Sequence, residues 1–434
     1  MSLVELALIL LLFMVAILAS GVWISIGLAL VGLLAMKLST QVPIGAVLAT
    51  SVWSASASWT LAALPLFIWM GEILFRTKLS EQMFQGLAPW LQWLPGRLLH
   101  VNVVGCGIFA AVSGSSAATC ATIGKISLPE LERRGYNSNM ALGSLAGAGT
   151  LGLLIPPSIP MVVYAVTANV SVLQVFLAGF IPGLMVMSLY SGYIIVWSLL
   201  NPDQTPPRDP PLPFLEKLKA SRQLLPTLAL ILGVFLSLIL GIATATECAA
   251  WGVFGALVLA WWSGVLTWET FSESLMSAAR LTGMIMLILA GAAFTTAAMA
   301  YTGIPAALAA WVEAKQLSPT MLIVALTIMY IILGCLIDGI SMIVLTAVIV
   351  LPMIQKAGFD LIWFGVYLII LVEMAQITPP VGFNLFVLQN MARKDTLTIA
   401  RASIPFFLLL VVAVVLITVF PQIVMVLPKA VFPD

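Results

Sequence analysis

Ionised side chains are scarce in this sequence. Only 8% of its 434 residues are charged and 62% are apolar, and the mean hydropathy is +1.14. Soluble domains carry about 25% charged residues, so the composition excludes a water-soluble globular protein. With ~20 residues per span, the chain has room for on the order of twelve membrane passes. The composition therefore predicts an all-α polytopic membrane protein.

The sequence also lacks the residue patterns of several kinds of active site. Its four cysteines lie far apart and without neighbouring histidines, which argues against a zinc or haem site. The single histidine, His100, is interpreted as an interfacial side chain rather than a proton relay. No Walker motif is present, and the G-x-G-x-x-G match at Gly147–Gly152 follows no strand. We expect no enzyme and no cofactor, so any pumping must draw on an ion gradient.

Positive charge does not dominate either, since 18 Lys and Arg stand against 17 Asp and Glu. A nucleic-acid partner is therefore not expected, whereas contact with membrane lipid is.

An internal repeat is the most informative feature that is present. Proline and glycine residues recur later in the chain at a constant distance from their first positions. This distance, which equals the difference between the residue numbers of Pro129 and Pro352, is called the repeat offset below. The match has no gap from about Leu94 to about Leu189. Shared leucine and valine arise easily by chance in apolar sequence, but several proline and glycine anchors in one register do not. The anchors are Pro129 and Pro352, Gly135 and Gly358, Pro156-Pro157 and Pro379-Pro380, and Ile181-Pro182 and Ile404-Pro405.

The repeat divides the chain into three parts. Residues 1–200 form the first half and residues 223–434 the second. Residues 201–222 join them as a Pro-rich linker followed by a basic amphipathic segment.

The distribution of basic residues favours an inverted relation between the halves. In most cases a basic loop of one half corresponds to a neutral or weaker loop of the other, which places equivalent loops on opposite sides of the membrane. The compared loops are Arg133-Arg134 with Gln355-Lys356, Arg393-Lys394 with Val170-Ser171, and Arg76 and Lys78 with Met299 and Tyr301.

Each half contains a predicted re-entrant hairpin and a broken helix. The segment of about 98–128 has arms too short for a crossing and a Ser-Gly-Ser-Ser tip at residues 113–116. Its counterpart spans about 319–352. The alternatives are two ordinary helices joined by a patch of small residues and a single span softened by glycine. The broken helices, of about 140–166 and about 361–390, are interrupted by Pro156-Pro157 and Pro379-Pro380.

Such breaks free backbone carbonyls that bind a small cation together with Ser and Thr hydroxyls. Asp338 is an acid in the middle of an apolar run, which marks it as a functional candidate; the alternative is a structural carboxyl. The first predicted cation site, which the family resemblance described below implies is a sodium site, comprises Ser113, Ser115, Gly152, Ile155 and Pro157. The second comprises Gly334, Asp338, Gly339, Ala375, Thr378 and Pro380.

Amino termini of half-helices also present positive dipole ends to an anion. The candidate substrate-binding residues lie beside the same tips and breaks. They are Ser116, Thr150, Pro156, Ser158, Ser341, Pro379 and Asn384.

Four runs of sequence identify a known family. SGSSAATCATIGKISLPEL with RRGYN, GTLGLLIPPSIPMVVYA, IDGISMIVLTAVIVLPMI and VEMAQITPPVGFNLFVLQ resemble the large membrane subunit, of DctM or SiaM type, of tripartite ATP-independent periplasmic (TRAP) transporters. The resemblance covers essentially the whole chain. It implies a sodium-driven importer of carboxylates such as sugar acids or dicarboxylates, working as an elevator in the bacterial inner membrane.

The resemblance also implies partners. These are a small four-helix membrane subunit, expected as a separate chain, and a periplasmic solute-binding protein. The alternative is a stand-alone ion-coupled anion transporter that needs no binding protein. A passive channel fits two broken-helix sites poorly, and a membrane enzyme lacks clustered reactive groups.

Overall fold

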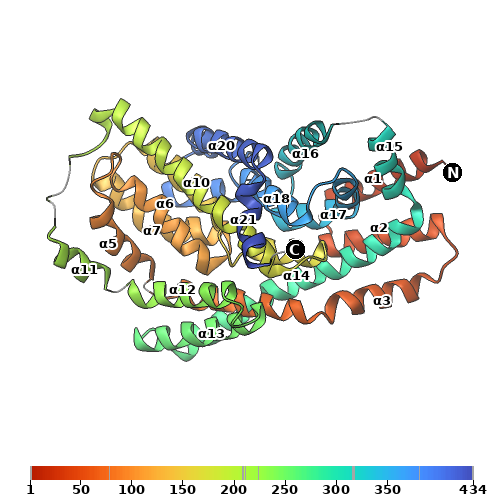
Figure 1. Ribbon diagram of the computed structural model, residues 1–434, viewed down its shortest axis with the longest axis horizontal. Coiled ribbons are helices and arrows are strands. Elements are labelled where there is room, and N and C mark those ends of the chain that lie inside the picture. Colours follow the sequence, from red (N-terminus) through yellow and green to blue (C-terminus); the bar gives the residue numbers. More distant parts are fainter. Residues whose placement is uncertain are drawn as a thin grey trace.

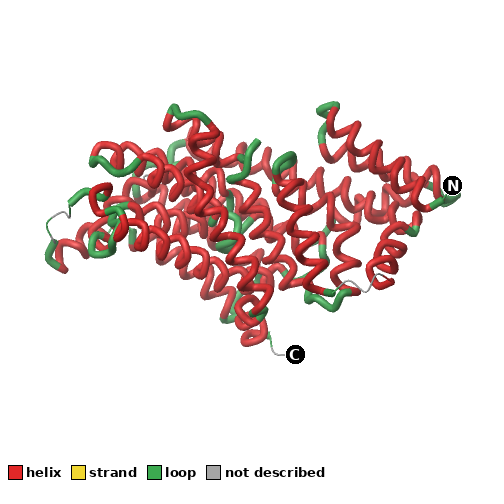
Figure 2. Tube along the Cα trace, turned by 90° about the horizontal axis from the view of Figure 1, so that it is seen from above, coloured by secondary structure: helices red, strands yellow, loops and turns green. Residues whose placement is uncertain are grey.

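The fold is helical throughout the part of the chain that the structure describes. This computed structural model describes residues 2–77, 79–207, 210, 212–222, 224–314, 318–380 and 382–432, and no strand occurs among them. Helices fill both ends of the elongated molecule, and short loops connect them (Figure 2). The predicted all-α class is confirmed.

The first half begins with short apolar helices and ends with a long one (Figure 1). Its elements are α1 (Leu3–Ala19), α2 (Ile24–Ser39), α3 (Ile44–Ser56), η1 (Trp59–Ala62), α4 (Ala63–Phe75), α5 (Leu79–Leu91), α6 (Leu99–Ser113), α7 (Ser116–Arg133), α8 (Ser138–Thr150), α9 (Ile159–Thr167) and α10 (Val172–Leu200).

The second half follows a connecting segment that contains η2 (Pro202–Gln204) and α11 (Phe214–Ser221). Its helices are α12 (Leu225–Ile239), α13 (Ala245–Trp262), α14 (Trp268–Thr302), α15 (Ile304–Ala314), α16 (Pro319–Gly334), α17 (Gly339–Lys356), α18 (Leu361–Gln376), α19 (Phe383–Ala392), α20 (Thr396–Val419) and α21 (Gln422–Val431).

Fewer helices cross the membrane alone than the composition suggests. Among the described residues, five helices are long and apolar enough, or six if α11 and α12 count as one bent span, and eight more apolar helices have only 10–17 residues. The estimate of about twelve passes is thus too high for single long helices, because several apolar segments are broken or short.

The helix boundaries of the two halves follow the offset of the sequence repeat. Helix α7 starts at Ser116 and ends at Arg133, and both ends of α17, Gly339 and Lys356, lie one repeat offset later. Helices α8 and α18 start at Ser138 and Leu361, which are also one repeat offset apart. Helices α1 and α2 lie before the region of the sequence match, yet they follow the same rule. When the repeat offset is added to their ends, the results fall close to the ends of α12 and α13.

One region departs from this correspondence. The second half has the continuous 35-residue helix α14, whereas the first half has α3, η1 and α4 over the equivalent residues. Pro65 is the third residue of α4. Proline disfavours helical backbone in the residue before it and removes a donor, which accounts for a helix that restarts here. The equivalent position in α14 is Ile288, which imposes no such restriction.

The second helix of each hairpin extends beyond the predicted end of the hairpin. Helix α7 continues through Pro129 to Arg133, and α17 continues through Pro352 to Lys356. Both prolines lie near the carboxyl ends of their helices, where a missing amide hydrogen bond and a bend are tolerated.

The connecting segment packs against the first half. Ser221 of α11 accepts a hydrogen bond from Trp90 Nε1 at 2.7 Å and donates to the Gly86 carbonyl at 2.9 Å, so α11 lies along α5. The Lys217 ammonium lies 5.7 Å from the centre of the Trp90 ring. Arg208, Asp209 and Pro211 of the predicted linker lie outside the described residues.

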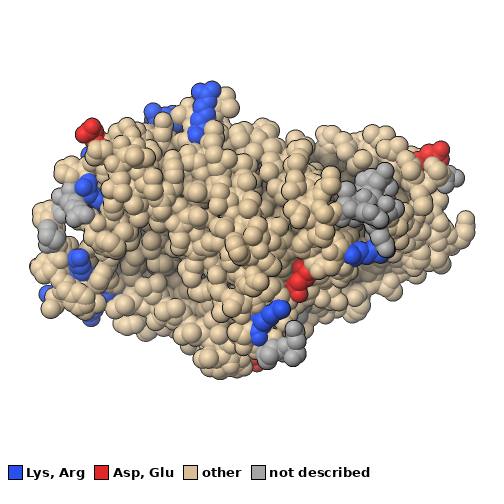
Figure 3. Space-filling view, turned by 45° about the horizontal axis from the view of Figure 1, so that its top comes forward, with Lys and Arg blue, Asp and Glu red and all other residues tan. Residues whose placement is uncertain are grey.

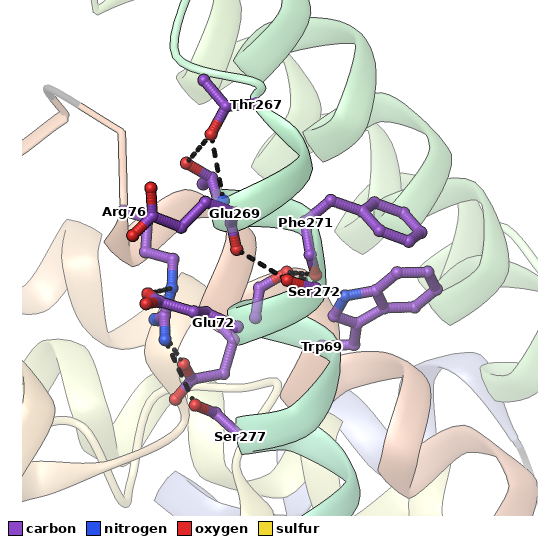
Figure 4. Close-up of polar contacts among 11 residues, drawn as sticks. Trp69, Glu72, Arg76, Thr267, Glu269, Phe271, Ser272 and Ser277 are labelled. Atoms are coloured by element: carbon purple, nitrogen blue, oxygen red, sulfur yellow. Dashed lines mark hydrogen bonds and ion pairs between the residues drawn. The ribbon is translucent and has the colours of Figure 1, made fainter.

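Helix α14 joins the two halves along most of its length. At one end, a methyl group on Gly291 would lie 2.5 Å from the Ser25 carbonyl oxygen, so only glycine allows α2 to approach so closely. At the other end, Arg76, the residue that follows α4, pairs with Glu72 at 2.8 Å and donates to Ser277 of α14 at 3.2 Å (Figure 4). Glu72 therefore belongs to the contact between α4 and α14.

The outer surface suits a lipid environment. Large apolar side chains such as Trp251 and Trp262 are exposed. On the face shown in Figure 3, uncharged residues cover most of the surface, and the few charged side chains lie mainly toward its edges, several of them at the left end. Lipid accepts apolar side chains on all sides, provided that backbone polar groups are satisfied within the helices.

Candidate functional site

The first candidate sodium site lies where the tip of the α6–α7 hairpin meets the unwound segment after α8. Gly114 turns the chain with φ +57°, and Ser115 caps α7 by accepting from the Ala118 amide at 3.4 Å. Ser113 Oγ lies 2.6 Å from Thr119 Oγ1. A methyl group on Gly152 would lie 2.5 Å from the Ser115 carbonyl oxygen, so the unwound segment touches the tip directly.

The other two residues of the first candidate sodium site, Pro157 and Ile155, face different parts of the molecule. The Pro157 carbonyl oxygen would lie 3.1 Å from a Cβ atom added to Gly114. The Ile155 side chain instead packs toward Gly107 of α6 and Gly183 of α10. The structure therefore brings Ser113, Ser115, Gly152 and Pro157 together, whereas the side chain of Ile155 points elsewhere.

The second candidate site lies at the α16–α17 tip. Asp338 caps α17: its carboxylate accepts from the Ser341 amide at 3.1 Å and from the Ser341 hydroxyl. The tip packs on the last turns of α18, since methyl groups on Gly334 and Gly339 would collide with Ala375 and Val372. The Thr378 hydroxyl donates back to the Met374 carbonyl at 2.6 Å, and Pro380 is exposed.

Asp338 and Ser115 occupy equivalent positions in the repeat, and each caps the second helix of its hairpin. Asp338 therefore fits both interpretations made from the sequence, since a capping carboxylate still has oxygen lone pairs for a cation.

The second break is shorter than the first. Helix α18 runs to Gln376, whereas α8 ends at Thr150, equivalent to Glu373. Ala375 stands where the first half has Gly152, and alanine favours helix by about 1 kcal/mol over glycine. The second half consequently has fewer free carbonyls at its break.

Both hairpin tips and both breaks line one open cavity of about 210 Å³. Ser115, Ser116, Asp338 and Gly339 come from the tips, and Leu153 and Gln376 come from the breaks. The first residues of four helices face it: Ser116 of α7, Ile159 of α9, Gly339 of α17 and Phe383 of α19. Helix amino termini carry unpaired amides and a partial positive charge, which favours an anion here.

The candidate substrate residues are distributed unevenly around this cavity. Ser116 lines it, while its hydroxyl donates to Asn384 Oδ1 at 2.8 Å. Asn384 in turn donates to the Ala146 carbonyl at 3.1 Å, which ties the first hairpin to α19 and α8.

The other candidates are engaged elsewhere. Ser158 donates to the Leu153 carbonyl across the unwound segment, and Ser341 donates to Asp338. Pro156 lines a separate small space beside α4 and α12, Thr150 is fully buried, and Pro379 is half-buried.

Some residues that now stand out were not singled out from the sequence. Gln376 lines the cavity from α18, and Leu281 faces it from α14. Gln376 is a polar residue two positions before Thr378 in the second broken span, which is the signal that points to it. His100, which was predicted to be interfacial, is fully buried within the protein, with Nε2 2.7 Å from the Pro95 carbonyl.

The two broken spans run in opposite directions. The Tyr164 hydroxyl of α9 donates to the Leu361 carbonyl at the start of α18, at 2.5 Å. Ser138, at the start of α8, shares a pocket with Arg393 and Lys394 after α19. The start of each broken span thus lies beside the end of the other.

Paired breaks, opposed hairpin tips and a cavity that they share in an apolar helical bundle define a multi-pass membrane transport protein. The chain belongs to the family of the tripartite ATP-independent periplasmic transporter, DctM component, whose model matches residues 11–423. This membership confirms the predicted family and a transport role rather than an enzymatic one.

Individual relatives agree with this assignment. The chain is 31% identical to the C4-dicarboxylate TRAP transporter large permease protein DctM of Pseudomonas aeruginosa, over 88% of this chain and 89% of that protein. It is 28% identical to the sialic acid TRAP transporter large permease protein SiaM of Vibrio cholerae, over 86% and 87%. The fold is similar to that of the YdaH transporter of Alcanivorax borkumensis, with a TM-score of 0.67, 13% identity, and 92% and 97% of the two chains covered.

Proposed function

We propose that this protein is the large membrane subunit of a sodium-coupled importer of small organic anions. The observation that carries the proposal is the convergence of four helix amino termini on one cavity between two hairpin tips. No Lys, Arg or His is among the cavity's lining residues within the described chain. A bound carboxylate would therefore be held by helix dipoles and amides together with neutral donors such as Gln376.

Asp338 gives a physical reason for coupling to a cation. Asp338 is among the residues that line a cavity that otherwise favours anions. A carboxylate substrate is repelled by an ionised Asp338, and a sodium ion bound beside Asp338 would cancel that repulsion. Sodium and substrate would then bind with positive cooperativity, which is what symport requires.

An elevator mechanism fits the set of elements that line the cavity. Its lining comes from the two hairpins and the two broken spans, with Leu281 contributed by α14. We propose that the hairpins and broken spans move together as a transport domain, and that α14 with the other amino-terminal helices of both halves forms the scaffold. The antiparallel broken spans support the inverted topology on which alternating access of this kind depends.

We propose that the substrate is a small carboxylate, since the relatives described above carry C4-dicarboxylates and sialic acid. The proposed partners are a periplasmic solute-binding protein and a small membrane subunit, and the proposed location is the bacterial inner membrane.

Reconstitution into liposomes tests the function. With the small subunit and the binding protein present, we expect labelled sugar acid or dicarboxylate to accumulate only when an inward sodium gradient is applied. A proton gradient with sodium on neither side is the control. Accumulation without the binding protein, or driven equally by protons, would support the stand-alone transporter instead.

The inverted topology predicts opposite sidedness for equivalent positions. Glu132 and Gln355 are both exposed and are repeat equivalents. In a Cys335→Ser background, where the other three cysteines are buried, we expect a membrane-impermeant thiol reagent to label Glu132→Cys from the cytoplasm and Gln355→Cys from the periplasm. A permeable reagent should label both, and labelling of both from one side would rule out inversion.

A further inference from the structure

An open pocket of about 440 Å³ lies between the carboxyl end of α10 and the amino-terminal half of α20, beside the start of α8. It is about twice as large as the cavity between the hairpin tips, and none of the candidate sodium or substrate residues lines it. We call it the α10–α20 pocket.

The polar side of the α10–α20 pocket presents hydrogen-bond donors that have no partner. Arg401 forms neither an ion pair nor a hydrogen bond within the described chain. The side chains of Asn139, Tyr193, Trp197 and Thr398 also lack hydrogen-bond partners there. All five can donate to an anion. No Asp or Glu is among the pocket's lining residues in the described part of the chain, so a positively charged group would find no counterion.

The apolar side of the same pocket continues onto the outer surface of the protein. The rings of Tyr193 and Phe406 meet edge to face, with their centres 5.4 Å apart. Val196 of α10 and Ile404 and Leu408 of α20 are exposed along the two helices that border the pocket. A ligand bound here would therefore have a charged end among donors and an apolar end along surfaces that face lipid, which describes a phospholipid.

The basic residues at this end of the molecule predict which leaflet supplies the lipid. Arg133 and Arg134 precede α8, and Arg393 and Lys394 precede α20. Short loops rich in Lys and Arg lie on the cytoplasmic side. The cytoplasmic leaflet carries anionic lipids, and basic pockets between membrane helices on that side bind their headgroups.

The second half closes the equivalent place with its own side chains. Trp363, the repeat equivalent of Met140, donates from Nε1 to the Ile417 carbonyl at 2.9 Å. Helix α21 packs against α10, α18 and α20 there. The repeat equivalents of Arg401 and Gln204 are Ala178 and Leu427, which are apolar.

The first half has no such cover within the described chain. The described residues that directly follow α10 form the short turn η2, and the next helix, α11, packs along α5 instead. A space that protein fills at one end of the molecule is thus left open at the other end, and it is lined there by donors rather than by apolar side chains.

We propose that the α10–α20 pocket binds an anionic phospholipid from the cytoplasmic leaflet. The phosphate pairs with the Arg401 guanidinium, and the acyl chains lie along α20 toward Ile404 and Leu408. The bound lipid holds α10 against α20, as α21 does in the second half. This binding does not depend on the proposed transport function.

Native mass spectrometry on the delipidated full chain tests the binding. We expect phosphatidylglycerol to be retained at about tenfold or more lower concentration than phosphatidylcholine with the same chains. Arg401→Gln should abolish this preference, because it removes a hydrogen bond to a charged group. Arg280→Gln, at an exposed arginine of α14, is the matched control and should keep it. Equal retention of the two lipids by the wild type, or an unchanged preference in Arg401→Gln, would overturn the proposal.

Glycerol 3-phosphate distinguishes a lipid from a soluble anion, because it carries the phosphate without the chains. We expect it not to displace phosphatidylglycerol at equal concentration. Displacement would show that the pocket takes a water-soluble anion and would overturn the lipid assignment.

Thermal unfolding gives a second readout that also shows whether each variant is folded. A ligand that binds only the folded protein stabilises it, so phosphatidylglycerol should raise the melting temperature of the wild type and of Arg280→Gln. Arg401→Gln should melt like the wild type without lipid and show a smaller rise with it. An equal rise in Arg401→Gln would place the lipid elsewhere and refute the proposal.

Tryptophan fluorescence locates the lipid independently of Arg401. Phosphatidylglycerol with brominated chains, added in an amount equal to the protein, should quench a component of the wild-type emission that Trp197→Phe lacks. Quenching of the same size in both proteins would mean that the lipid does not lie beside Trp197, which would also overturn the proposal.

Discussion

Gly152→Ala is expected to lower sodium-dependent uptake by about tenfold or more while the protein still reaches the membrane. The added methyl group would lie 2.5 Å from the Ser115 carbonyl oxygen and 2.7 Å from Thr119 Oγ1. Backbone cannot yield as a flexible side chain can, so the hairpin tip must move away from the unwound segment. Overpacking of this kind costs ~1–3 kcal/mol, and each 1.4 kcal/mol is about tenfold in binding. The measurement is initial uptake as a function of sodium concentration.

Gly192→Ala is the matched control. Gly192 lies in α10, and a methyl group there would meet nothing within 4 Å, so its uptake should equal that of the wild type. If Gly152→Ala transports with the wild-type sodium dependence at the same amount of protein in the membrane, the tip and the first break do not form a sodium site.

Asp338→Asn is expected to raise the half-saturating sodium concentration by roughly ten- to a hundredfold. Hydrogen bonds and contacts that involve a charged group contribute ~1.5–3 kcal/mol, which corresponds to that range. Asparagine caps a helix about as well as aspartate, so the start of α17 is preserved and only the charge is lost. The readout is the sodium dependence of uptake together with substrate binding at fixed sodium.

Asp360→Asn provides the comparison for a capping aspartate outside the site. Asp360 caps α18 by accepting from the Ile362 and Trp363 amides at 2.6 and 3.1 Å, and it is exposed. We expect no change in its sodium dependence. If both variants behave alike, Asp338 is only a cap, and the structural interpretation of this carboxyl is the right one.

Local sequence was a good guide to where helices break. Pro156-Pro157 and Pro379-Pro380 remove amide donors and restrict the preceding residue, and the helices on either side end and restart around them. Composition was a poorer guide to how many helices cross the membrane, because apolar residues do not distinguish a full span from a hairpin arm or a short scaffold helix.

Side-chain direction was not accessible from sequence. Ile155, Pro156 and Ser158 lie in unwound backbone without helical periodicity, so nothing local indicates which way each one points. Ser116 and Asn384 are 268 residues apart and hydrogen-bond to each other, a pairing that arises only from the packing of α7 against α19.

The sequence by itself determined that this is a membrane protein with scarce charge, two related halves and proline breaks at equivalent positions. Those properties depend on composition and on local backbone chemistry, which each segment carries wherever it lies. Only the tertiary structure decided that four helix amino termini meet at one cavity, and that the start of each broken span lies beside the end of the other. Both depend on how distant segments pack against each other, because a contact between the two halves exists only when they are folded together.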